Sequence, residues 1–236
     1  MALPKINSSP EYTLKIPSNS KEITYRPYLV KEEKILLMAI ESEDPKLMYS
    51  AIVNTLTSCI KEEININSLT IFDVEYIFIQ LRSKSTGDLI KLKPKCEKCE
   101  AEQMVGINIE EVKVDTPKLK DELKLTDNIT LKMKWPTYNE MINEIGDGTN
   151  LSQTSMAFKM INKCIHSIMT DEENINLSEV DPKEVEDFIG ELNTEQFTKI
   201  REYIELMPRL KHELKWNCES CSTVNSRLLQ GMNDFF

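Results

Sequence analysis

The sequence has few of the residues on which enzymes most often depend. Its 236 residues include only two histidines, and neither lies near a serine or cysteine in a context that suggests a nucleophile. None of the six glycines belongs to a phosphate-binding loop or a dinucleotide fingerprint. Carboxylates are abundant, but nothing in their spacing pairs two of them for catalysis. These absences predict a protein that is not an enzyme.

Long apolar runs are also missing. No stretch approaches the roughly 20 apolar residues that a bilayer-spanning helix needs. The beginning of the chain, MALPKINSSPEYTLKIP, shows no apolar core followed by a small-residue cleavage site, so we expect no secretory signal. We therefore expect a reducing compartment, in which the six cysteines are thiols or metal ligands rather than disulfides.

The charge is strongly negative overall and unevenly distributed. A net charge of −10 argues against general affinity for nucleic acid or for an anionic membrane. Ten acidic residues and one lysine lie between Asp171 and Glu195, whereas six basic and three acidic residues lie between Arg82 and Glu100. The acidic stretch is typical of a solvated helical face. It is also suited to docking a basic partner through Glu184, Glu186 and Asp187.

The first half of the chain is expected to be extended and then helical. Prolines at 4, 10, 17 and 27 exclude helix from residues 1–30, where two short β-type runs occur. Helices are predicted from Lys31, from Asp44 with Pro45 at the first helical position, and from Thr70. The third of these helices is apolar on nearly every side, which predicts that it is the buried centre of this half.

The second half is expected to repeat this order. A strand is predicted in NITLKMKWP, a loop in EIGDGTN, and a helix from Leu151 through SMAFKMINKCIHSIM. Two more helices are predicted from Asp181 and Asn193. Both halves then end in strand, CxxC and strand, and SCIKEEININ resembles IMTDEENINL. This similarity is consistent with an internal duplication, although short matches in Lys/Glu/Asn-rich sequence also arise by chance.

The predicted fold class is therefore α+β. We expect a helical body with two similar halves, each ending in a β-hairpin that carries a CxxC knuckle, and a zinc-ribbon-like site that joins the two hairpins. The expected divisions are an extended segment over residues 1–30, a first half over 31–115 and a second half over 116–236.

Two CxxC pairs supply the ligands of a tetrahedral zinc site. Two intervening residues let both sulfurs of a pair turn toward one ion, and the second pair completes the site. The sequence thus predicts one structural zinc bound by four thiolates, at Cys96, Cys99, Cys218 and Cys221. Cysteines without a metal and a redox-active dithiol are the alternatives, because the distance between the pairs exceeds that of common zinc ribbons.

Other residues near these motifs have simpler expected roles. Cys59 and Cys164 lie on apolar helical faces and are expected to be small core residues. His166 and His212 are left out of the metal site. The lysines around the knuckles either offset the negative charge of a four-thiolate zinc or are solvated strand residues; they are Lys91, Lys93, Lys95, Lys98 and Lys215.

Residues Ile16 to Ser42, followed by TIFDVEYIFIQLRSKS and a CxxC hairpin, resemble the baseplate hub assembly proteins of T-even-like tailed phages. YRPYLVKEEKILL is the most distinctive part of this resemblance, which covers residues 10–110 well and the remainder by length and order. The resemblance implies a non-enzymatic role in assembling the baseplate hub, or as a part of it, through contacts with other tail proteins. It also implies action in the host cytoplasm during assembly and a place in the tail baseplate.

YRPYLV is the candidate contact segment, because tyrosine and arginine are enriched at interface anchors. Its candidate residues are Tyr25, Arg26, Pro27, Tyr28 and Leu29. The alternative is that this segment packs inside the first half. The rival function from another class is a nucleic-acid-binding zinc-ribbon protein. The lysines of the first hairpin favour it, whereas the net charge of −10 and the absence of an aromatic stacking face oppose it.

Overall fold

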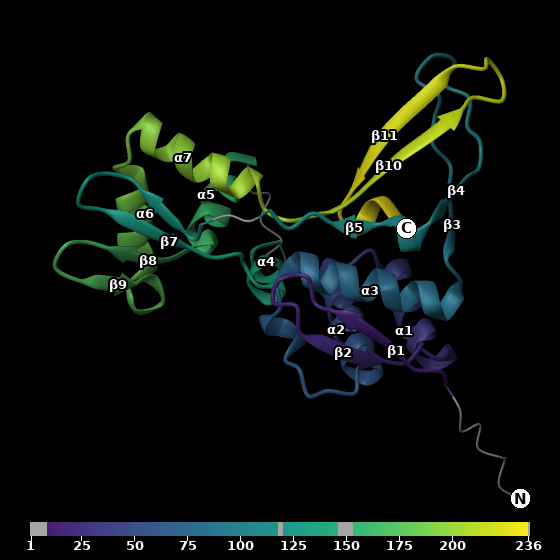
Figure 1. The fold of residues 1–236 in the computed structure, drawn as a ribbon, viewed down its shortest axis with the longest axis horizontal. Helices are drawn as coiled ribbons and strands as arrows, with labels where there is room; N and C mark the ends of the chain where they lie inside the picture. The colour runs from purple at the N-terminus through teal and green to yellow at the C-terminus, as the bar shows by residue number, and fades with distance from the viewer. Residues whose placement is uncertain (1–8, 118–119, 146–152, 236) are drawn as a thin grey trace, which may run out of the picture. The chain divides into compact units, whose positions relative to one another are not determined.

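The computed structural model describes residues 9–117, 120–145 and 153–235, and the chain divides into two compact units (Figure 1). Unit 1 comprises Met1–Asp115 together with Arg209–Phe236, and unit 2 comprises Thr116–Pro208. Residues 209–236, expected in the second half, are instead grouped with unit 1. The chain therefore leaves unit 1, forms unit 2 and returns.

The described residues of unit 1 form a short N-terminal hairpin, three helices and two further hairpins. Its elements are β1 (Tyr12–Lys15), β2 (Glu22–Tyr25), α1 (Val30–Ser42), α2 (Pro45–Cys59), η1 (Ile66–Ser68), α3 (Ile71–Thr86), β3 (Leu89–Leu92), β4 (Val105–Asn108), η2 (Ile109–Glu111), β5 (Lys113–Val114), β10 (Leu210–Asn217), β11 (Val224–Gln230) and η4 (Met232–Phe235). The strands pair as β1-β2, β3-β4 and β11-β10-β5, all antiparallel.

The helices of unit 1 begin where the sequence predicts. Asp44 caps α2 by accepting a hydrogen bond from the Lys46 N–H, and Pro45 occupies the first turn. Thr70 caps α3 in the same way, through the N–H of Asp73. Half of the side chains of α3 are buried, which confirms the prediction that this helix is the centre of the first half.

The returning segment belongs to unit 1 because it pairs and packs there. Leu210 and Lys211 of β10 pair with Val114 and Lys113 of β5. One apolar cluster then joins α3 and the β3-β4 hairpin, called the first hairpin below, to the β10-β11 hairpin, called the second hairpin. Its buried members are Ile79, Ile90, Ile107, Ile109, Val112, Leu210, Leu214, Trp216, Leu229 and Phe235. Burial of these side chains is the driving force that places the C-terminal hairpin on the first one.

Unit 2 combines one four-stranded sheet with four helices among its described residues. Its elements are β6 (Glu122–Lys124), β7 (Thr130–Met133), α4 (Tyr138–Ile145), α5 (Gln153–Cys164), β8 (Ile165–Met169), β9 (Asn174–Asn176), η3 (Leu177–Glu179), α6 (Pro182–Gly190) and α7 (Thr194–Glu205). The sheet order is β6-β7-β8-β9, and every pairing is antiparallel. No described helix of either unit has the length and apolar character needed to cross a membrane.

One predicted helix of unit 2 is wrong at its end. The helix expected to run through HSIM stops at Cys164, and residues 165–169 form β8 instead. Ile165 and Ile168 are buried in the unit 2 core, and β8 is hydrogen-bonded on both sides, to β7 and β9. This tertiary pairing overrides the helical periodicity of the segment. Most of the predicted loop EIGDGTN lies outside the described residues.

The same backbone contact joins hairpin to helix in both units. In unit 1 the Arg26 N–H, just after β2, donates to the carbonyl of Cys59 at the end of α2 (3.0 Å). In unit 2 the Lys134 N–H, just after β7, donates to the carbonyl of Cys164 at the end of α5 (2.7 Å). Each buried cysteine therefore marks the point at which a helix returns to its hairpin.

Glu32, in the first turn of the helix α1 that follows the N-terminal hairpin, completes this arrangement in unit 1. The Glu32 carboxylate accepts the Leu29 N–H (2.8 Å) and pairs with the Arg26 guanidinium (3.0 Å). These contacts lower the pKa of Glu32 in spite of its burial, because they favour the charged form of the carboxyl group. A side chain that is only 5% exposed is thus satisfied on both oxygens.

Glu140 makes the matching contacts in unit 2. Its carboxylate accepts the Thr137 N–H (2.8 Å) and pairs with the Lys134 ammonium (2.8 Å), and these contacts likewise lower its pKa in spite of burial. Asparagines then cap η1 and η3 in the same way, each by accepting the N–H two residues later. The two units therefore share a local hydrogen-bonding arrangement as well as an order of elements.

We predict unequal costs for removing the two matched glutamates. Glu32→Ala leaves the guanidinium of Arg26 without its buried partner and should lower the free energy of unfolding by about 3 kcal/mol. Glu140→Ala should cost about 1 kcal/mol, because the Glu140 side chain is 27% exposed and water replaces the lost contacts. Urea unfolding measures both. The exposed Lys34→Ala is the control, and equal losses for the two glutamates would contradict this account.

Candidate metal centre

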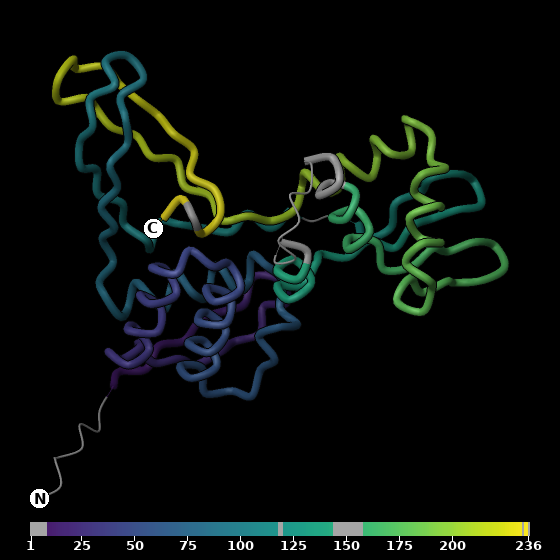
Figure 2. The backbone as a smooth tube through the Cα atoms, turned by 180° about the vertical axis from the view of Figure 1, so that it is seen from behind, coloured from purple at the N-terminus to yellow at the C-terminus, as the bar shows by residue number. Residues whose placement is uncertain are grey.

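The four predicted ligands lie at the tips of two hairpins of unit 1. Cys96 and Cys99 lie in the loop between β3 and β4, and Cys218 and Cys221 lie in the turn between β10 and β11. Figures 1 and 2 show the two tips side by side from opposite directions. Residues more than a hundred positions apart in the sequence are thus brought together, as the paired motifs predict.

The sulfur atoms form a compact cluster. The Sγ atoms of Cys96 and Cys221 are 3.7 Å apart, those of Cys99 and Cys218 are 3.6 Å apart, and all four lie within 4.8 Å of one another. A tetrahedron with Zn–S bonds of about 2.3 Å has edges of about 3.8 Å. The cluster therefore has the dimensions of a four-thiolate site that could hold one metal ion.

Each tip is a tight turn with the same backbone contacts. The Cys96 N–H donates to the carbonyl of Ala101 (3.0 Å), and the Glu100 N–H donates to the carbonyl of Cys96 (2.9 Å). Glu100 adopts a positive φ of 58°, which reverses the chain directly after the second cysteine. The second tip repeats both hydrogen bonds and the positive φ through Cys218, Ser222 and Thr223.

Gln103 fastens the first hairpin to the second turn. Its side-chain amide donates to the carbonyl of Asn217 (3.0 Å) and its side-chain carbonyl accepts the N–H of Glu219 (2.8 Å). Both contacts flank Cys218 in the sequence. The side chain therefore fixes the position of that cysteine relative to the first pair.

Asn225 plays the corresponding part from the second hairpin. Its side-chain carbonyl accepts the N–H of Glu97 (3.1 Å), its amide donates to the carbonyl of Thr223 (2.9 Å), and the residue is 2% exposed. Sequence reasoning missed both amide residues. The available signal was their spacing, because Gln103 and Asn225 each lie four residues after the second cysteine of a pair.

The local environment shifts the thiol pKa values in opposite directions. The Thr223 side chain, whose Oγ1 lies 3.3 Å from Cys221 Sγ, lowers the pKa of Cys221 to about 6. The backbone N–H of Cys99 lowers the pKa of Cys96. For Cys99 the N–H of Ala101 acts downward, but the neighbouring sulfurs outweigh it and raise the pKa to about 12. Four thiolates this close repel one another, and a divalent cation removes that repulsion.

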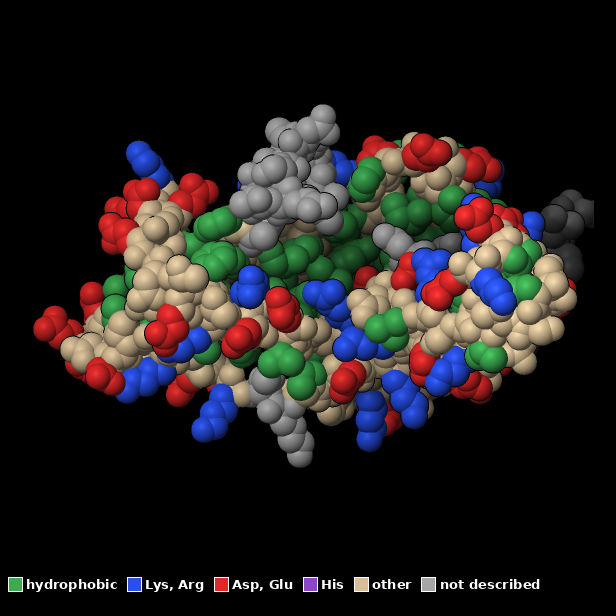
Figure 3. All heavy atoms as spheres, turned by 90° about the horizontal axis from the view of Figure 1, so that it is seen from above, with side chains coloured by type: hydrophobic (Ala, Val, Ile, Leu, Met, Phe, Trp, Pro, Cys, Tyr) green, Lys and Arg blue, Asp and Glu red, His purple; other side chains and the backbone are tan. Residues whose placement is uncertain are grey.

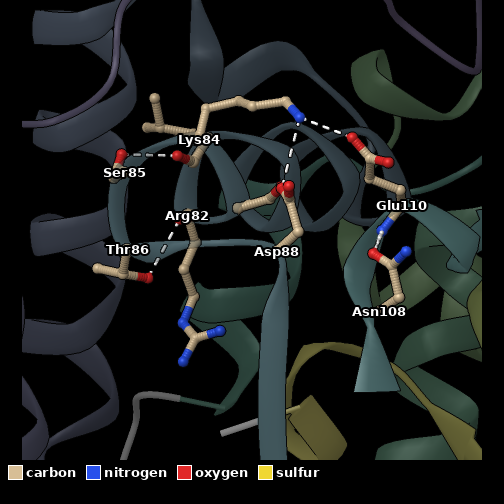
Figure 4. A network of polar contacts seen from close by, with 9 residues as sticks. Arg82, Lys84, Ser85, Thr86, Asp88, Asn108 and Glu110 are labelled. Atoms are coloured by element: carbon tan, nitrogen blue, oxygen red, sulfur yellow. Dashed lines mark hydrogen bonds and ion pairs between the residues drawn. The ribbon is translucent and has the colours of Figure 1, made fainter. Parts of the chain in front are cut away.

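A polar network fixes the base of the first hairpin to α3 (Figure 4). The ammonium of Lys84 lies between the carboxylates of Asp88 and Glu110, at 3.4 Å and 2.7 Å. Asp88 also accepts a hydrogen bond from the hydroxyl of Ser83. The network joins the end of α3 to the residues before β3 and after β4. The strands that lead to Cys96 and Cys99 therefore start from a fixed helix.

The lysines near the cluster are exposed, and two of them pair with carboxylates. Lys95 lies 3.6 Å from Glu102, and Lys215 lies 2.8 Å from Glu213. Acidic side chains lie between the basic ones over the face drawn in Figure 3, which disperses the positive charge.

The remaining cysteines and both histidines lie outside the cluster. Cys59 and Cys164 are 1% and 0% exposed, and burial raises the pKa of the first thiol to about 11 and of the second to about 12. The prediction that both are core residues is confirmed. His166 is exposed on β8, and His212 belongs to β10, away from the turn. Neither joins the metal cluster found among the described residues.

The candidate contact segment YRPYLV is mostly engaged within unit 1. Tyr25 is 3% exposed, and the Arg26 guanidinium pairs with Glu32 and donates to the carbonyls of Pro27 and Ser58. Tyr28 is half-buried and lines an apolar groove of about 540 Å³ beside α1, α2 and α3. Leu29 is 46% exposed and is the most accessible of the five candidate residues.

The acidic candidates lie on the outer face of α6. Glu184, Glu186 and Asp187 are exposed, whereas Val185 and Ile189 of the same helix are buried in the unit 2 core. The helix is thus amphipathic, with its acidic side chains in solvent. They are accessible to a partner.

Comparison with known proteins gives the class of this protein. Residues 9–236 match the family described as T4 bacteriophage base plate protein, and the chain belongs to that family. A relative is the baseplate hub assembly protein gp26 of Enterobacteria phage T4. It is 23% identical over 227 residues, which cover 96% of this chain and 98% of the relative. No solved structure matches.

We predict that Asn225 is required for the docking of the two turns. Asn225→Ala leaves the N–H of Glu97 without its acceptor and removes one of the two hydrogen bonds to the carbonyl of Thr223, which keeps the N–H of Cys218; it should lower the free energy of unfolding by about 2 kcal/mol. Urea unfolding measures the loss. Asn217→Ala on the adjacent strand is the matched control, since only its backbone carbonyl contacts Gln103. A loss no larger than that of the control would contradict this role.

Proposed function

We propose that the protein acts in assembling the central hub of a contractile-tail baseplate, or is built into that hub, through protein–protein contacts and without catalysis. The observation that carries the proposal is the full-length match to a baseplate hub assembly protein. We further propose that it meets its partners in the host cytoplasm during assembly and is located at the tail baseplate.

The proposal includes one structural zinc ion held by Cys96, Cys99, Cys218 and Cys221. The sulfur separations of 3.6 Å and 3.7 Å support it, since they are close to the edge of a zinc tetrathiolate. Two strand–turn–strand tips facing one ion form a zinc-ribbon-like site. Four protein ligands leave no open position for a substrate, so the zinc has a structural role.

A clamp at this place suits a protein that must present fixed surfaces. The metal would join the tip of the first hairpin to a segment that the chain reaches only after completing unit 2. Binding free energies for structural zinc are about 10–16 kcal/mol in small peptides at neutral pH, and this energy is available to folding because the unfolded chain lacks the site. The tips would then be held more strongly than their polar contacts alone allow.

The acidic face of α6 is the proposed contact surface for a basic partner. Its carboxylates are exposed, whereas Val185 and Ile189 of the same helix are buried. Such a surface increases the rate of association with a positively charged protein and selects against acidic ones. In the N-terminal segment, the accessible Leu29, which follows the groove-lining Tyr28 in the sequence, is the remaining candidate for contact.

We predict about one zinc per chain in protein purified without added metal. Cys218→Ser should abolish most of that zinc and expose residues 211–236 to protease, while most of the helical circular dichroism signal remains. Chelation of the native protein should have the same effect. Cys59→Ser is the matched control, because this cysteine is buried away from the cluster and should leave the zinc content unchanged. Less than about half an equivalent of zinc in the native protein, with the four cluster thiols freely titratable, would end the proposal.

We predict that the acidic face contributes to partner binding in a salt-dependent manner. Replacing Glu184, Glu186 and Asp187 by lysine should weaken association with a baseplate hub protein, most visibly at low ionic strength. A pull-down across salt concentrations measures this. The matched control replaces Glu122, Asp127 and Glu202, exposed acidic residues of unit 2 outside the stretch from Asp171 to Glu195, by lysine. Equal binding by all forms at every salt concentration would remove the acidic face from the account.

A further inference from the structure

β11 is an unusually long edge strand for this protein. It lies at the end of the order β11-β10-β5 and has seven residues. The other edge strands of the described residues have two to four residues. Short edges are a common protection against pairing with another chain, and β11 lacks that protection.

The pairing with β10 determines which backbone groups of β11 face outward. The Cys218 N–H donates to Thr223 and the Gly231 N–H donates to Leu210, so alternate residues between these points bond to β10. Those facing outward are Val224, Ser226, Leu228 and Gln230. The N–H of Gln230 is taken by the Asp234 carboxylate (2.7 Å). The other three N–H groups have no acceptor among the described residues.

The side chains of this edge are apolar where they are most exposed. Val224 is 74% exposed and Leu228 is 52% exposed, and with Ser226 between them they lie on one face of the strand. The intervening Asn225 is 2% exposed, because the opposite face covers the first hairpin. An open backbone edge flanked by exposed apolar side chains favours addition of another strand.

We propose that two copies of this chain associate by antiparallel pairing of their β11 edges, with the two-fold axis at Ser226. Ser226 then faces the partner's Ser226, and Val224 faces the partner's Leu228 on both sides of the axis. Three residue pairs exchange both of their backbone bonds, which gives about six hydrogen bonds. The two sheets join into one that runs from β5 through both β11 strands to the second β5.

The edge is complementary to itself in this register. Each apolar side chain meets an apolar one, which is the favourable type of cross-strand pair. Arg227 lies opposite the partner's Asn225, so like charges do not meet. Symmetric registers shifted by one residue would use fewer of the three open N–H groups, and Asp234 closes the edge beyond Leu228. A second copy is therefore the occupant that the edge itself specifies.

Sedimentation equilibrium of the full chain tests the proposal. We expect a concentration-dependent dimer for the native chain, and loss of that dimer in Ser226→Pro, which removes an outward N–H and keeps the bonds to β10. Ser226→Ala is the matched control: it loses the same hydroxyl contact with Glu213 (2.9 Å) but keeps the N–H, and should remain dimeric. Native chain that stays monomeric at high micromolar concentration, or a proline variant that dimerises as well as the alanine variant, would overturn the proposal.

A cysteine placed on the axis tests the register without weakening the strand. Directly opposed residues that exchange backbone bonds have Cα atoms about 5.5 Å apart, within disulfide range. Ser226→Cys should therefore form a covalent dimer under mild oxidation in the presence of zinc, above the baseline of the native chain. Lys215→Cys, on the same face of β10, would lie about 14 Å from its symmetric counterpart and should not. Equal crosslinking of the two variants would overturn the register.

Discussion

The architecture of unit 1 depends on the return of the chain after unit 2. Leu210 of β10 pairs with Val114 of β5, and Leu214 and Leu229 belong to the apolar cluster that also contains Ile90 and Ile107 of the first hairpin. Without this segment, Ile79 and Ile107 would lose much of their covering. The cysteine cluster, the contacts of Gln103 and Asn225, and the open edge of β11 all lie on the hairpin that this packing places. Closure of a long loop costs little more than closure of a short one, so an inserted unit is compatible with this return.

The two units repeat one local design, and the cysteine cluster lies where the two CxxC hairpins of unit 1 meet. Each unit has a hairpin, two helices ending in a buried cysteine, and a glutamate that caps a helix while pairing with a nearby base. Each CxxC hairpin contributes only two thiolates. Neither hairpin alone supplies the four ligands of a tetrahedral site. A four-thiolate site therefore forms only when the two CxxC hairpins have docked.

Local signals in the sequence predicted most of the elements. Capping residues such as Asp44 and Thr70 located helix starts, and cysteine spacing located both hairpin tips. What failed depended on distant partners: residues 165–169 read as helix, because nothing local shows that β7 and β9 lie on either side. Nothing local shows either that residues 209–236 pair with β5 and belong to unit 1. The roles of Gln103 and Asn225 could not be predicted, because the backbone groups that they bond lie on the opposite turn, more than a hundred residues away in the sequence.

The base and the tip of the second hairpin are held by different forces. At the base, Leu210 and Leu229 are 0% and 1% exposed, and their burial does not depend on protonation or on metal. At the tip, Cys99 is exposed. The position of the tip is held by the side-chain amides of Gln103 and Asn225 and, in the proposed function, by a metal bound to the four sulfurs. Backbone hydrogen bonds between β10 and β11 transmit order from one end to the other. The outer edge at Val224 lies directly beside the tip, so the conformation of the edge and the state of the thiols are physically linked.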